Sequence, residues 1–366
     1  MKFSIGRDEL LNALQAVIGV VEKKQTMPIL SNLLLKQSGG QLTIVGTDLE
    51  LELVTTVSTL SGEDGSTTVP ARKFFDICKG LPDGCDIEAT LSAQRMTVKS
   101  SRSRFVLSTL SAEEFPFLED IQDAQQIPVD MGTLRQLLGR THFAMAHQDV
   151  RYYLNGLLLE AKADLLRAVA TDGHRLALSD APGEYPVKEP ISVIVPRKAV
   201  MELMRLIDDD EENVSLAFSS NHLQLSLGTT RFTTKLIDGR FPDYERVIPE
   251  KGDKMLTADR ENVRRALQRA AILSNEKFRG VRLLLEQGGL KLQAQNPEHE
   301  EAEEELEVQY EGEALEIGFN VNYLLDALGA LESEEFLLEL TSQDKSGLIT
   351  EKDDTRHRYV VMPMRL

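Results

Sequence analysis

The stretch TVPARKFFDICKGL, residues 68–81, returns in altered form as IVPRKAVMELMRLI at residues 194–207. Both copies end a strand-like run on Val-Pro, continue with an Arg-Lys pair and carry apolar residues at helical spacing. Three related segments also recur: SRFVLSTL begins at residue 103, TRFTTKLIDGRFPDY at 230 and HRYVVMPMRL at 357, each 127 residues after the one before. This period predicts one fold repeated three times along the chain.

The middle of each repeat predicts short antiparallel strands. SNLLLKQSGGQLTIVGTDLELEL (31–53), LNGLLLEAKADLLRAVATDGHRLAL (154–178) and RGVRLLLEQGGLKLQAQNPEHEEAEEEL (279–306) all combine period-two alternation with a Gly- or Asp-containing turn. Six helices are expected, two in each repeat, over 7–24, 71–81, 132–145, 196–206, 259–272 and 319–331. We therefore expect an α+β protein with three tandem domains at 1–124, 125–252 and 253–366, each with two helices packed on antiparallel sheets.

Composition places the chain among folded proteins without a membrane span. Of its 366 residues, 42% are hydrophobic and 27% are charged, and no apolar run approaches the length that crosses a bilayer. The start MKFSIGRDELL has no signal-peptide core. Cys78 and Cys85 lack the C-x-x-C spacing and suit a reducing compartment. A cytoplasmic location is expected.

The signs of charge are distributed unevenly. The six expected helices carry a net charge of +7, so that the rest of the chain carries −25 of the total of −18. If the repeats align their helices on one side, these basic residues form a stripe that attracts phosphate groups. Solvated helix faces are the simpler alternative. The basic residues concerned are Arg72, Lys73, Lys79, Arg135, Arg140, Arg197, Lys198, Arg205, Arg264, Arg265 and Arg269.

The segment VATDGHRLALS (169–179) has the residue types of an active site in Asp172, His174 and Arg175. No nucleophile, P-loop or metal-ligand spacing accompanies them, and GTDLEL at the same place in the first repeat has neither His nor Arg. We interpret Thr171 and Asp172 as a turn, with the aspartate accepting backbone N–H bonds. A non-catalytic protein without cofactor or metal is expected. A hydrolase or nuclease using Asp172 and His174, and an acidic protein-interaction scaffold that never touches DNA, are the alternatives.

Six motifs in order carry a family resemblance: TVPARKFFDICKGLP, MAHQDVRYYLNG, ATDGHRLAL, DGRFPDYERV, AILSNEKFRGVRL and YVVMPMRL. Together they resemble the bacterial beta sliding clamps, the processivity subunits of DNA polymerase III. The resemblance implies a head-to-tail homodimer that forms a six-domain ring around duplex DNA and tethers the replicative polymerase. It also implies that the clamp loader, other polymerases and repair factors bind through short linear motifs.

The resemblance further implies three sets of site residues. DNA would be faced by Lys24, Arg72, Lys73, Gln148, Tyr152, Tyr153 and Arg197. Strand-edge packing is the alternative for the two tyrosines. Partner peptides would occupy a groove formed by Leu154, Thr171, Gly173, His174, Arg175, Leu176, Pro242, Arg246, Val247, Phe278, Asn320, Tyr323, Ser346, Val360, Met362, Pro363, Met364 and Arg365. Asp344 and Lys345 place charges beside this groove where a more neutral wall is expected.

The third set would close the ring between the first repeat of one chain and the third repeat of its partner. SRSRF is expected to place Arg102 and Arg104 on one face of a strand, with Phe105 and Leu107 on the other. The acidic run PEHEEAEEELE would face this strand, with Ile272 and Leu273 as the apolar centre. The acidic residues concerned are Glu298, Glu300, Glu301 and Glu304. A solvated acidic surface is the alternative for them.

Overall fold

The computed structural model describes residues 1–22, 27–118, 121, 124–207 and 213–365, and one order of elements occurs in it three times. The first copy comprises β1 (Lys2–Gly6), α1 (Arg7–Val17), β2 (Asn32–Ser38), β3 (Gln41–Thr47), β4 (Leu51–Ser58), β6 (Gly65–Pro70), α2 (Ala71–Gly80), β7 (Asp86–Ser92), β8 (Arg95–Ser100) and β9 (Ser103–Ser108). The short strand β5 (Ser61–Glu63) is added to it.

The second copy comprises β10 (Gln125–Asp130), α3 (Met131–Gly139), β11 (Gly156–Lys162), β12 (Leu165–Thr171), β13 (Arg175–Pro182), β14 (Ile191–Pro196), α4 (Arg197–Leu206), β15 (Asn213–Phe218), β16 (His222–Leu227) and β17 (Thr230–Lys235). The third comprises β18 (Lys254–Asp259), α5 (Arg260–Ile272), β19 (Gly280–Glu286), β20 (Gly289–Gln295), β21 (Glu301–Glu307), β23 (Leu315–Asn320), α6 (Val321–Ala330), β24 (Glu335–Leu340), β25 (Gly347–Glu351) and β26 (His357–Val361), with β22 (Gln309–Tyr310) added. The threefold repetition predicted from the sequence is confirmed.

The chain divides into two compact units that cut across the repeats. Residues 1–131 and 201–236 form one unit, and residues 132–200 and 237–366 form the other. The reason is that the last strand of each of the second and third repeats pairs with the repeat before it. In the first unit β17 pairs with β4, and in the second unit β26 pairs with β13.

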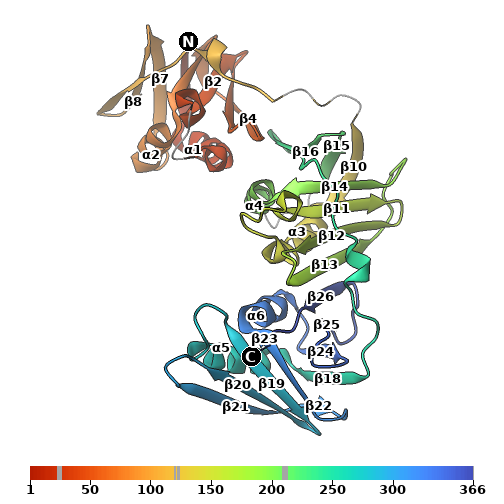
Figure 1. Cartoon of the computed structure of the whole chain (residues 1–366). Coiled ribbons are helices and arrows are strands. Elements are labelled where there is room, and N and C mark those ends of the chain that lie inside the picture. Colours follow the sequence, from red (N-terminus) through yellow and green to blue (C-terminus); the bar gives the residue numbers. More distant parts are fainter. Residues whose placement is uncertain (23–26, 119–120, 122–123, 208–212, 366) are drawn as a thin grey trace. The chain divides into compact units, whose positions relative to one another are not determined.

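The first unit contains a five-stranded sheet, ordered β5-β1-β7-β8-β9, and an eight-stranded sheet, ordered β10-β15-β16-β17-β4-β3-β2-β6. All pairings are antiparallel. Helices α1 and α2 pack against each other and against these strands (Figure 1). Phe3, Leu14, Leu33 and Phe74 are fully buried between them, and burial of such side chains supplies most of the driving force for folding.

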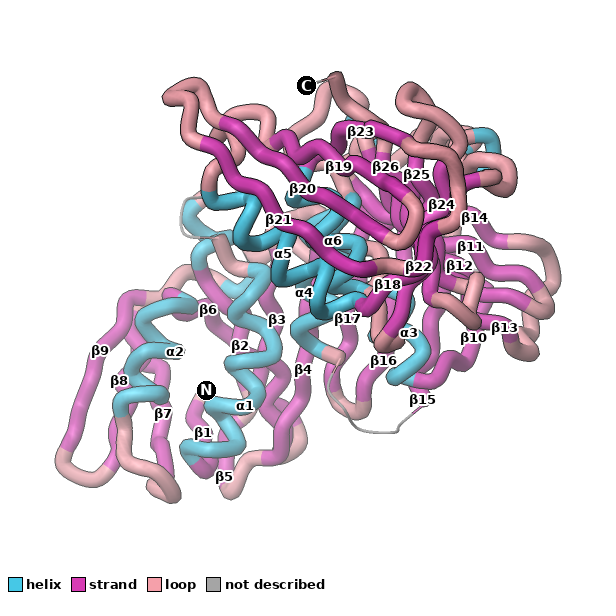
Figure 2. Tube along the Cα trace, turned by 90° about the horizontal axis from the view of Figure 1, so that it is seen from below, coloured by secondary structure: helices cyan, strands magenta, loops and turns pink. Residues whose placement is uncertain are grey.

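The second unit contains a nine-stranded sheet, ordered β14-β11-β12-β13-β26-β25-β24-β18-β22, and a four-stranded sheet, ordered β21-β20-β19-β23. Figure 2 shows α5 beside β20 and β21, which it also contacts. A core cluster that includes Leu158, Leu176, Leu178, Tyr244 and Val360 packs on the nine-stranded sheet. This cluster lies where the second and third repeats meet, because β13 and β26 both contribute to it.

Local sequence explains where the helices begin. The Val-Pro pairs end β6 and β14 directly before α2 and α4, since proline lacks the N–H that would continue a strand ladder and fits the start of a helix. In the third repeat Asn320 takes this place, and its Oδ1 accepts a bond of 2.9 Å from the N–H of Asn322, which caps α6.

Two helices are shorter than the sequence predicts. α1 ends at Val17 and continues as a 3-10 turn over Ile18–Val20, in a run of β-branched residues that disfavours an α-helix. α3 ends at Gly139 instead of 145. There the hydroxyl of Thr141 donates to the carbonyl of Leu137 at 2.6 Å, and a 3-10 turn follows over His142–Ala144.

Candidate peptide groove, nucleic-acid-facing residues and edge strands

A tight turn between β12 and β13 carries the Asp-His-Arg cluster. The Thr171 hydroxyl donates to the carbonyl of Arg175 at 2.6 Å and accepts from the N–H of Gly173 at 3.1 Å. Asp172 Oδ1 accepts from the N–H groups of His174 (2.9 Å) and Arg175 (3.0 Å). The predicted turn function of the Thr-Asp pair is therefore confirmed.

The first repeat has the same turn between β3 and β4. The Thr47 hydroxyl donates to the carbonyl of Leu51 and accepts from the N–H of Leu49, and Asp48 Oδ1 accepts from the N–H groups of Glu50 and Leu51. The third turn residue has positive φ in both repeats, 78° at Leu49 and 88° at Gly173. The two turns thus differ mainly in their side chains, which makes residues 173–176 the local specialisation of the second repeat.

Arg175 is fixed by contacts on several sides. Its guanidinium donates to Asp172 Oδ2 at 3.1 Å, to Asp326 Oδ2 of α6 at 2.5 Å and to the carbonyl of Phe143 at 2.7 Å. The guanidinium carbon also lies 4.5 Å from the centre of the Tyr323 ring, a favourable cation–π arrangement. Arg175 therefore joins the turn to the third repeat and holds its shape.

The turn forms one wall of an apolar cavity of about 180 Å³. Leu176 and Val360 lie opposite each other in the β13–β26 pair and belong to the core cluster beneath. Nine of the predicted groove residues line this cavity: Leu154, Thr171, Gly173, Arg175, Leu176, Pro242, Val247, Val360 and Met362. Its lining of few polar groups over an apolar floor is typical of a pocket that receives apolar side chains.

Three lining residues are missing from the predicted groove: Arg151, Tyr153 and Tyr244. Tyr153 is assigned to DNA by the resemblance, whereas its half-buried ring packs on the core cluster under the cavity. Tyr244 follows Pro242 in the motif DGRFPDYERV, so its spacing from Pro242 and Val247 is the signal that could have found it. Arg151 has no such signal, because its position depends on a loop conformation.

Arg151 lines the cavity beside the turn. Its guanidinium donates to both carboxylate oxygens of Asp149, at 3.0 and 2.8 Å, and to the carbonyl of Asp172 at 3.2 Å. These bonds lower the pKa of Asp149 to about 2. A Cβ atom on Gly173 would lie 2.8 Å from Arg151 Nη1. Glycine is thus favoured at 173 both by its positive φ and by this close approach.

Tyr244 is held at the cavity by a polar network. Its hydroxyl donates to Glu160 Oε2 at 2.5 Å and accepts from Arg167 Nη1 at 3.0 Å. Burial, and then the hydrogen bond to Glu160, raises the pKa of Tyr244 to about 12. Because Arg167 is itself paired with Asp180 at 2.5 Å, the ring is fixed rather than free to swing into the cavity.

The C-terminal segment continues the groove beyond this cavity. The N–H of Met362 donates to the carbonyl of His174 at 2.9 Å, and that of Met364 donates to the carbonyl of Gly318 at 2.8 Å. Pro363, Met364 and Arg365 line a second cavity of about 560 Å³ together with Asp344. The charged residue Asp344 thus belongs to the wall of this second cavity.

The remaining predicted groove residues lie around these cavities without lining the first. Phe278 is 55% exposed and lines a neighbouring cavity with Met364 and Arg365. Asn320 Nδ2 donates to the carbonyl of Phe278 at 3.4 Å. Of the others, Tyr323 lies under Arg175, His174 is exposed, Arg246 pairs with Asp243 at 2.8 Å, and half-buried Ser346 directly precedes β25.

The predicted DNA-facing residues belong to both compact units. Arg72 and Lys73 lie on the exposed face of α2, opposite its buried Phe74 and Cys78, and Arg72 donates to the carbonyl of Val21 at 3.1 Å. Lys24 lies outside the described residues.

The other DNA-facing candidates lie in the second unit. Gln148 is exposed with a φ of 56°, and Arg197 Nη1 donates to the carbonyl of Met145 at 3.2 Å. Tyr152 is 57% exposed, and its ring centre lies 5.7 Å from that of Tyr153. Both tyrosines lie on the 3-10 turn Tyr152–Leu154 and not at a strand edge, and the Tyr153 ring packs on the core cluster.

The expected stripe of helix cations needs one correction. Arg140 is 5% exposed and pairs with Glu351 and Glu332 at 3.0 Å each, since it follows the end of α3 and points into the junction between repeats. It cannot contribute to a basic surface.

Three cations of α5 are paired within the chain. Arg264 and Arg265 pair with Glu261 at 2.9 and 3.0 Å, and Arg269 pairs with Glu304 at 2.6 Å. Arg265 and Arg269 remain more than half exposed. Any attraction of α5 for phosphate is therefore weaker than its formal charge predicts.

The predicted ring-closing strands are both sheet edges. β9 ends the five-stranded sheet and β21 ends the four-stranded sheet. On β9, Arg104 and Phe105 are exposed and Leu107 is buried. Arg102 lies in the turn before β9 and not on the strand, which corrects the expectation that it shares a strand face with Arg104.

The third repeat places its interface candidates at and beside the other edge. Ile272 at the end of α5 is 75% exposed, and Leu273 is half-buried. Glu298 and Glu300 lie in the turn before β21, and Glu301 and Glu304 lie on that strand. Glu304 faces α5 and pairs with Arg269, whereas Glu301 lies on the opposite, exposed face.

Two observations bear on other kinds of site. In the described part of the chain, no group of three or more His, Cys, Asp or Glu side chains could hold a metal ion. None of the helices in those same residues is long and apolar enough to cross a membrane. Three copies of one α+β unit, with an apolar groove where the second meets the third, define a repeat-built protein that binds other macromolecules.

Comparison with known proteins specifies this class. Three domain families match in order: the N-terminal domain of the DNA polymerase III beta subunit over residues 1–119, its central domain over 128–243 and its C-terminal domain over 245–365. The beta sliding clamps of Pseudomonas putida and Escherichia coli K12 are 52% and 51% identical, and each match covers 100% of both chains. The chain belongs to the DNA polymerase III beta subunit family.

Solved structures agree. The DNA polymerase III subunit beta of Pseudomonas aeruginosa matches with a TM-score of 0.97 at 50% identity, over 100% of both chains. A second structure from that organism, a sliding clamp bound to griselimycin, matches with a TM-score of 0.96 at 51% identity over 100% of both chains. The fold of three clamp domains is thus shared along the whole chain.

Proposed function

We propose that the chain is a sliding clamp that encircles duplex DNA and tethers the replicative polymerase. The observation that carries this proposal is the full-length match to beta sliding clamps, together with three clamp domains in one chain. As a beta subunit, the chain is a non-catalytic accessory subunit of DNA polymerase III. Its place of action is the cytoplasm, and its domains are bounded at 1–124, 125–252 and 253–366.

The ring is a head-to-tail homodimer. The exposed edges β9 and β21 support this arrangement, because an unpaired strand edge is ready to pair with another chain. Arg102 and Arg104 carry charge opposite to that of Glu298, Glu300 and Glu301, and Ile272 offers an exposed apolar anchor. A contact between two different surfaces closes a ring when its rotation permits.

The ring holds DNA without reading its sequence. Arg72, Lys73 and Lys24 of the first repeat, with Gln148, Tyr152 and Arg197 of the second, contact the sugar–phosphate backbone. Tyr153, whose half-buried ring packs on the core cluster, supports the neighbouring Tyr152 ring in this role. The exposed cations of α2 support this role, since phosphate contacts release counterions.

The groove between the second and third repeats receives short peptides of the polymerase, the clamp loader and repair factors. The apolar cavity of about 180 Å³ supports this role, and Met362 and Met364 beside it are flexible enough to accept varied apolar side chains. Since a Pseudomonas aeruginosa sliding clamp binds griselimycin, we expect this chain to bind it as well.

The C-terminal segment offers a direct test of the groove. Deletion of residues 362–366 removes Met362 from the lining of the first cavity and Pro363, Met364 and Arg365 from that of the second, while β9, β21 and Ile272 remain. We expect the truncated protein to lose binding of a labelled polymerase peptide in fluorescence polarisation and to remain a dimer in sedimentation. Full peptide affinity in the truncated dimer would refute the groove assignment.

A further inference from the structure

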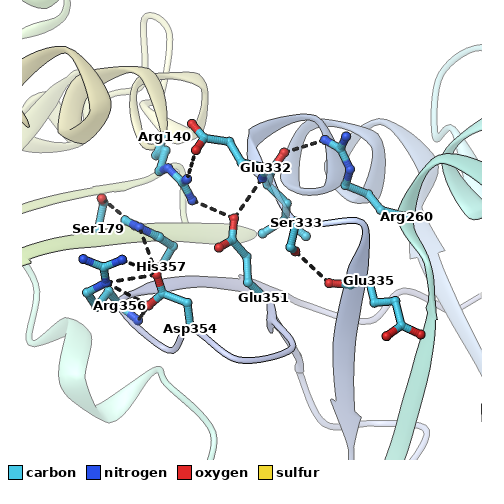
Figure 3. Close-up of polar contacts among 11 residues, drawn as sticks. Arg140, Ser179, Arg260, Glu332, Ser333, Glu335, Glu351, Asp354, Arg356 and His357 are labelled. Atoms are coloured by element: carbon cyan, nitrogen blue, oxygen red, sulfur yellow. Dashed lines mark hydrogen bonds and ion pairs between the residues drawn. The ribbon is translucent and has the colours of Figure 1, made fainter. Parts of the chain in front are cut away.

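The β13–β26 pair that forms the groove floor carries a buried polar contact on its opposite face. Leu176 and Val360 lie opposite each other at the floor, and Ser179 and His357 lie opposite each other three residues further along. Because side chains alternate, this second pair faces away from the groove. Ser179 Oγ and His357 Nδ1 are 2.8 Å apart, and both residues are at most 1% exposed (Figure 3).

His357 is surrounded by charges that are already paired. Arg140 at the end of α3 contacts Glu351 of β25 and Glu332 after α6, and Arg356 contacts Asp354 in the turn before β26 (Figure 3). His357 Nε2 has no hydrogen-bond partner, and it lies 3.9 Å from Asp354 Oδ2. The Tyr359 side chain is buried on the same face of β26.

These surroundings favour the neutral imidazole. Burial, and secondly the positive charge of Arg140, lower the pKa of His357, and the opposing effect of Asp354 and Glu351 is smaller. A lowered pKa means that a disordered or opened strand binds the proton more readily than the packed one. The contribution of the neutral His357 side chain to the stability of the packed strand is therefore complete above about pH 6.5, the ordinary pKa of histidine. It is lost as the pH falls toward the lower pKa of His357 in the folded protein.

We propose that Ser179 and His357 are positioning residues for the groove, and that protonation of His357 loosens the β13–β26 pairing and so weakens partner binding in mild acid. The proposal rests on the groove function given above. Its structural basis is that β26 runs from His357 through Val360 to Met362 of the cavity wall. A displacement of this strand moves both groove residues at once.

The test is a binding titration with the full-length dimer and a polymerase peptide that carries a rhodamine label, whose fluorescence does not change between pH 7.5 and 5.5. We expect the affinity of the wild type to fall several-fold over this range, by at most about tenfold per pH unit for one proton. His357→Gln keeps a hydrogen-bonding amide but does not titrate. Whatever its affinity at pH 7.5, it should lose this pH dependence.

The matched control is His174→Gln, which removes the histidine at the groove rim. This variant should keep the pH dependence that His357→Gln loses. The proposal is overturned if His357→Gln retains the slope of the wild type, or if His174→Gln abolishes it. If His357→Gln weakens binding by the same factor relative to the wild type at every pH, the effect of the substitution is purely structural. That result would also overturn the proposal.

A second measurement does not depend on peptide binding or on the folding of His357→Gln. In NMR of histidine-labelled wild type, the His357 signal, identified by its shift in Ser179→Ala, should titrate below about pH 6.5. A midpoint at or above that value contradicts the proposal. If the peptide fails to bind the wild type at pH 7.5, the groove function itself is refuted, whereas the titration still decides whether the imidazole is held neutral.

Discussion

At the scale of single residues, the Asp172 turn has the residue types of a catalytic site, but the contacts of its side chains are structural. Its carboxylate organises the backbone of residues 174–175 and contacts Arg175, which in turn reaches Asp326. Catalysis needs a reacting group near such a carboxylate, and here its oxygens are occupied by bonds that shape the groove wall. In the proposed groove, the cluster is a support for recognition.

The contribution of Asp172 to peptide binding can be tested by comparison with Asp48, the equivalent aspartate of the first repeat. Asp172→Ala leaves the N–H groups of His174 and Arg175 without their acceptor, at a cost of about 1–3 kcal/mol. We expect it to weaken peptide binding in fluorescence polarisation by roughly tenfold or more, since about 1.4 kcal/mol corresponds to tenfold.

Asp48→Ala is the matched control, because Asp48 has the same role in the first repeat and does not line the groove cavities. It should affect the unfolding temperature similarly and leave peptide affinity unchanged. Equal losses of affinity in both variants would contradict the assignment of Asp172 to the groove.

The sequence indicates which residues form the turn more reliably than it indicates their contact partners far along the chain. Thr171 and Asp172 were predictable because a short polar side chain after a strand bonds to its own turn. The burial of Arg140 was not, because helical periodicity near a helix end does not reveal that Glu351, over two hundred residues away, supplies its partner. The position of Tyr153 under the groove depended likewise on tertiary contacts.

At the scale of elements, the repeat itself was readable from sequence, and the sheets that join the repeats were not. The order of helices and strands follows from periodicity, from Val-Pro boundaries and from the spacing of 127 residues. Which strand of one repeat pairs with which strand of the next leaves no local pattern. The pairing of β26 with β13, on which the groove depends, became visible only in the fold.

The end of α5 and the edge strand β21 give the prediction at this scale. Replacing Ile272 and Leu273 by alanine removes the apolar anchors proposed for ring closure, of which Ile272 is 75% exposed. We expect a folded monomer in sedimentation at micromolar concentration. Met255→Ala removes another exposed apolar side chain of the same repeat, on β18 of the nine-stranded sheet and not on α5 or β21, and should stay dimeric. A dimer that persists in the double variant would refute the interface.

At the scale of the whole molecule, the acidic character of the chain is compatible with DNA binding. The net charge is −18, yet a protein that surrounds DNA needs only modest attraction at the inner surface, because topology prevents escape. Intrachain pairing of Arg264, Arg265 and Arg269 fits such weak contact. Retention of an acidic scaffold that does not encircle DNA would be the same on circular DNA and on DNA with ends.

Retention on DNA with and without ends tests the central claim most directly. The protein would be loaded by its clamp loader onto a nicked circular plasmid, separated from free protein by gel filtration, and followed after a single-cut restriction enzyme linearises the plasmid. We expect the protein to travel with the circle and to be lost on linearisation. Equal retention on circular and linear DNA would contradict a clamp that holds DNA by encircling it.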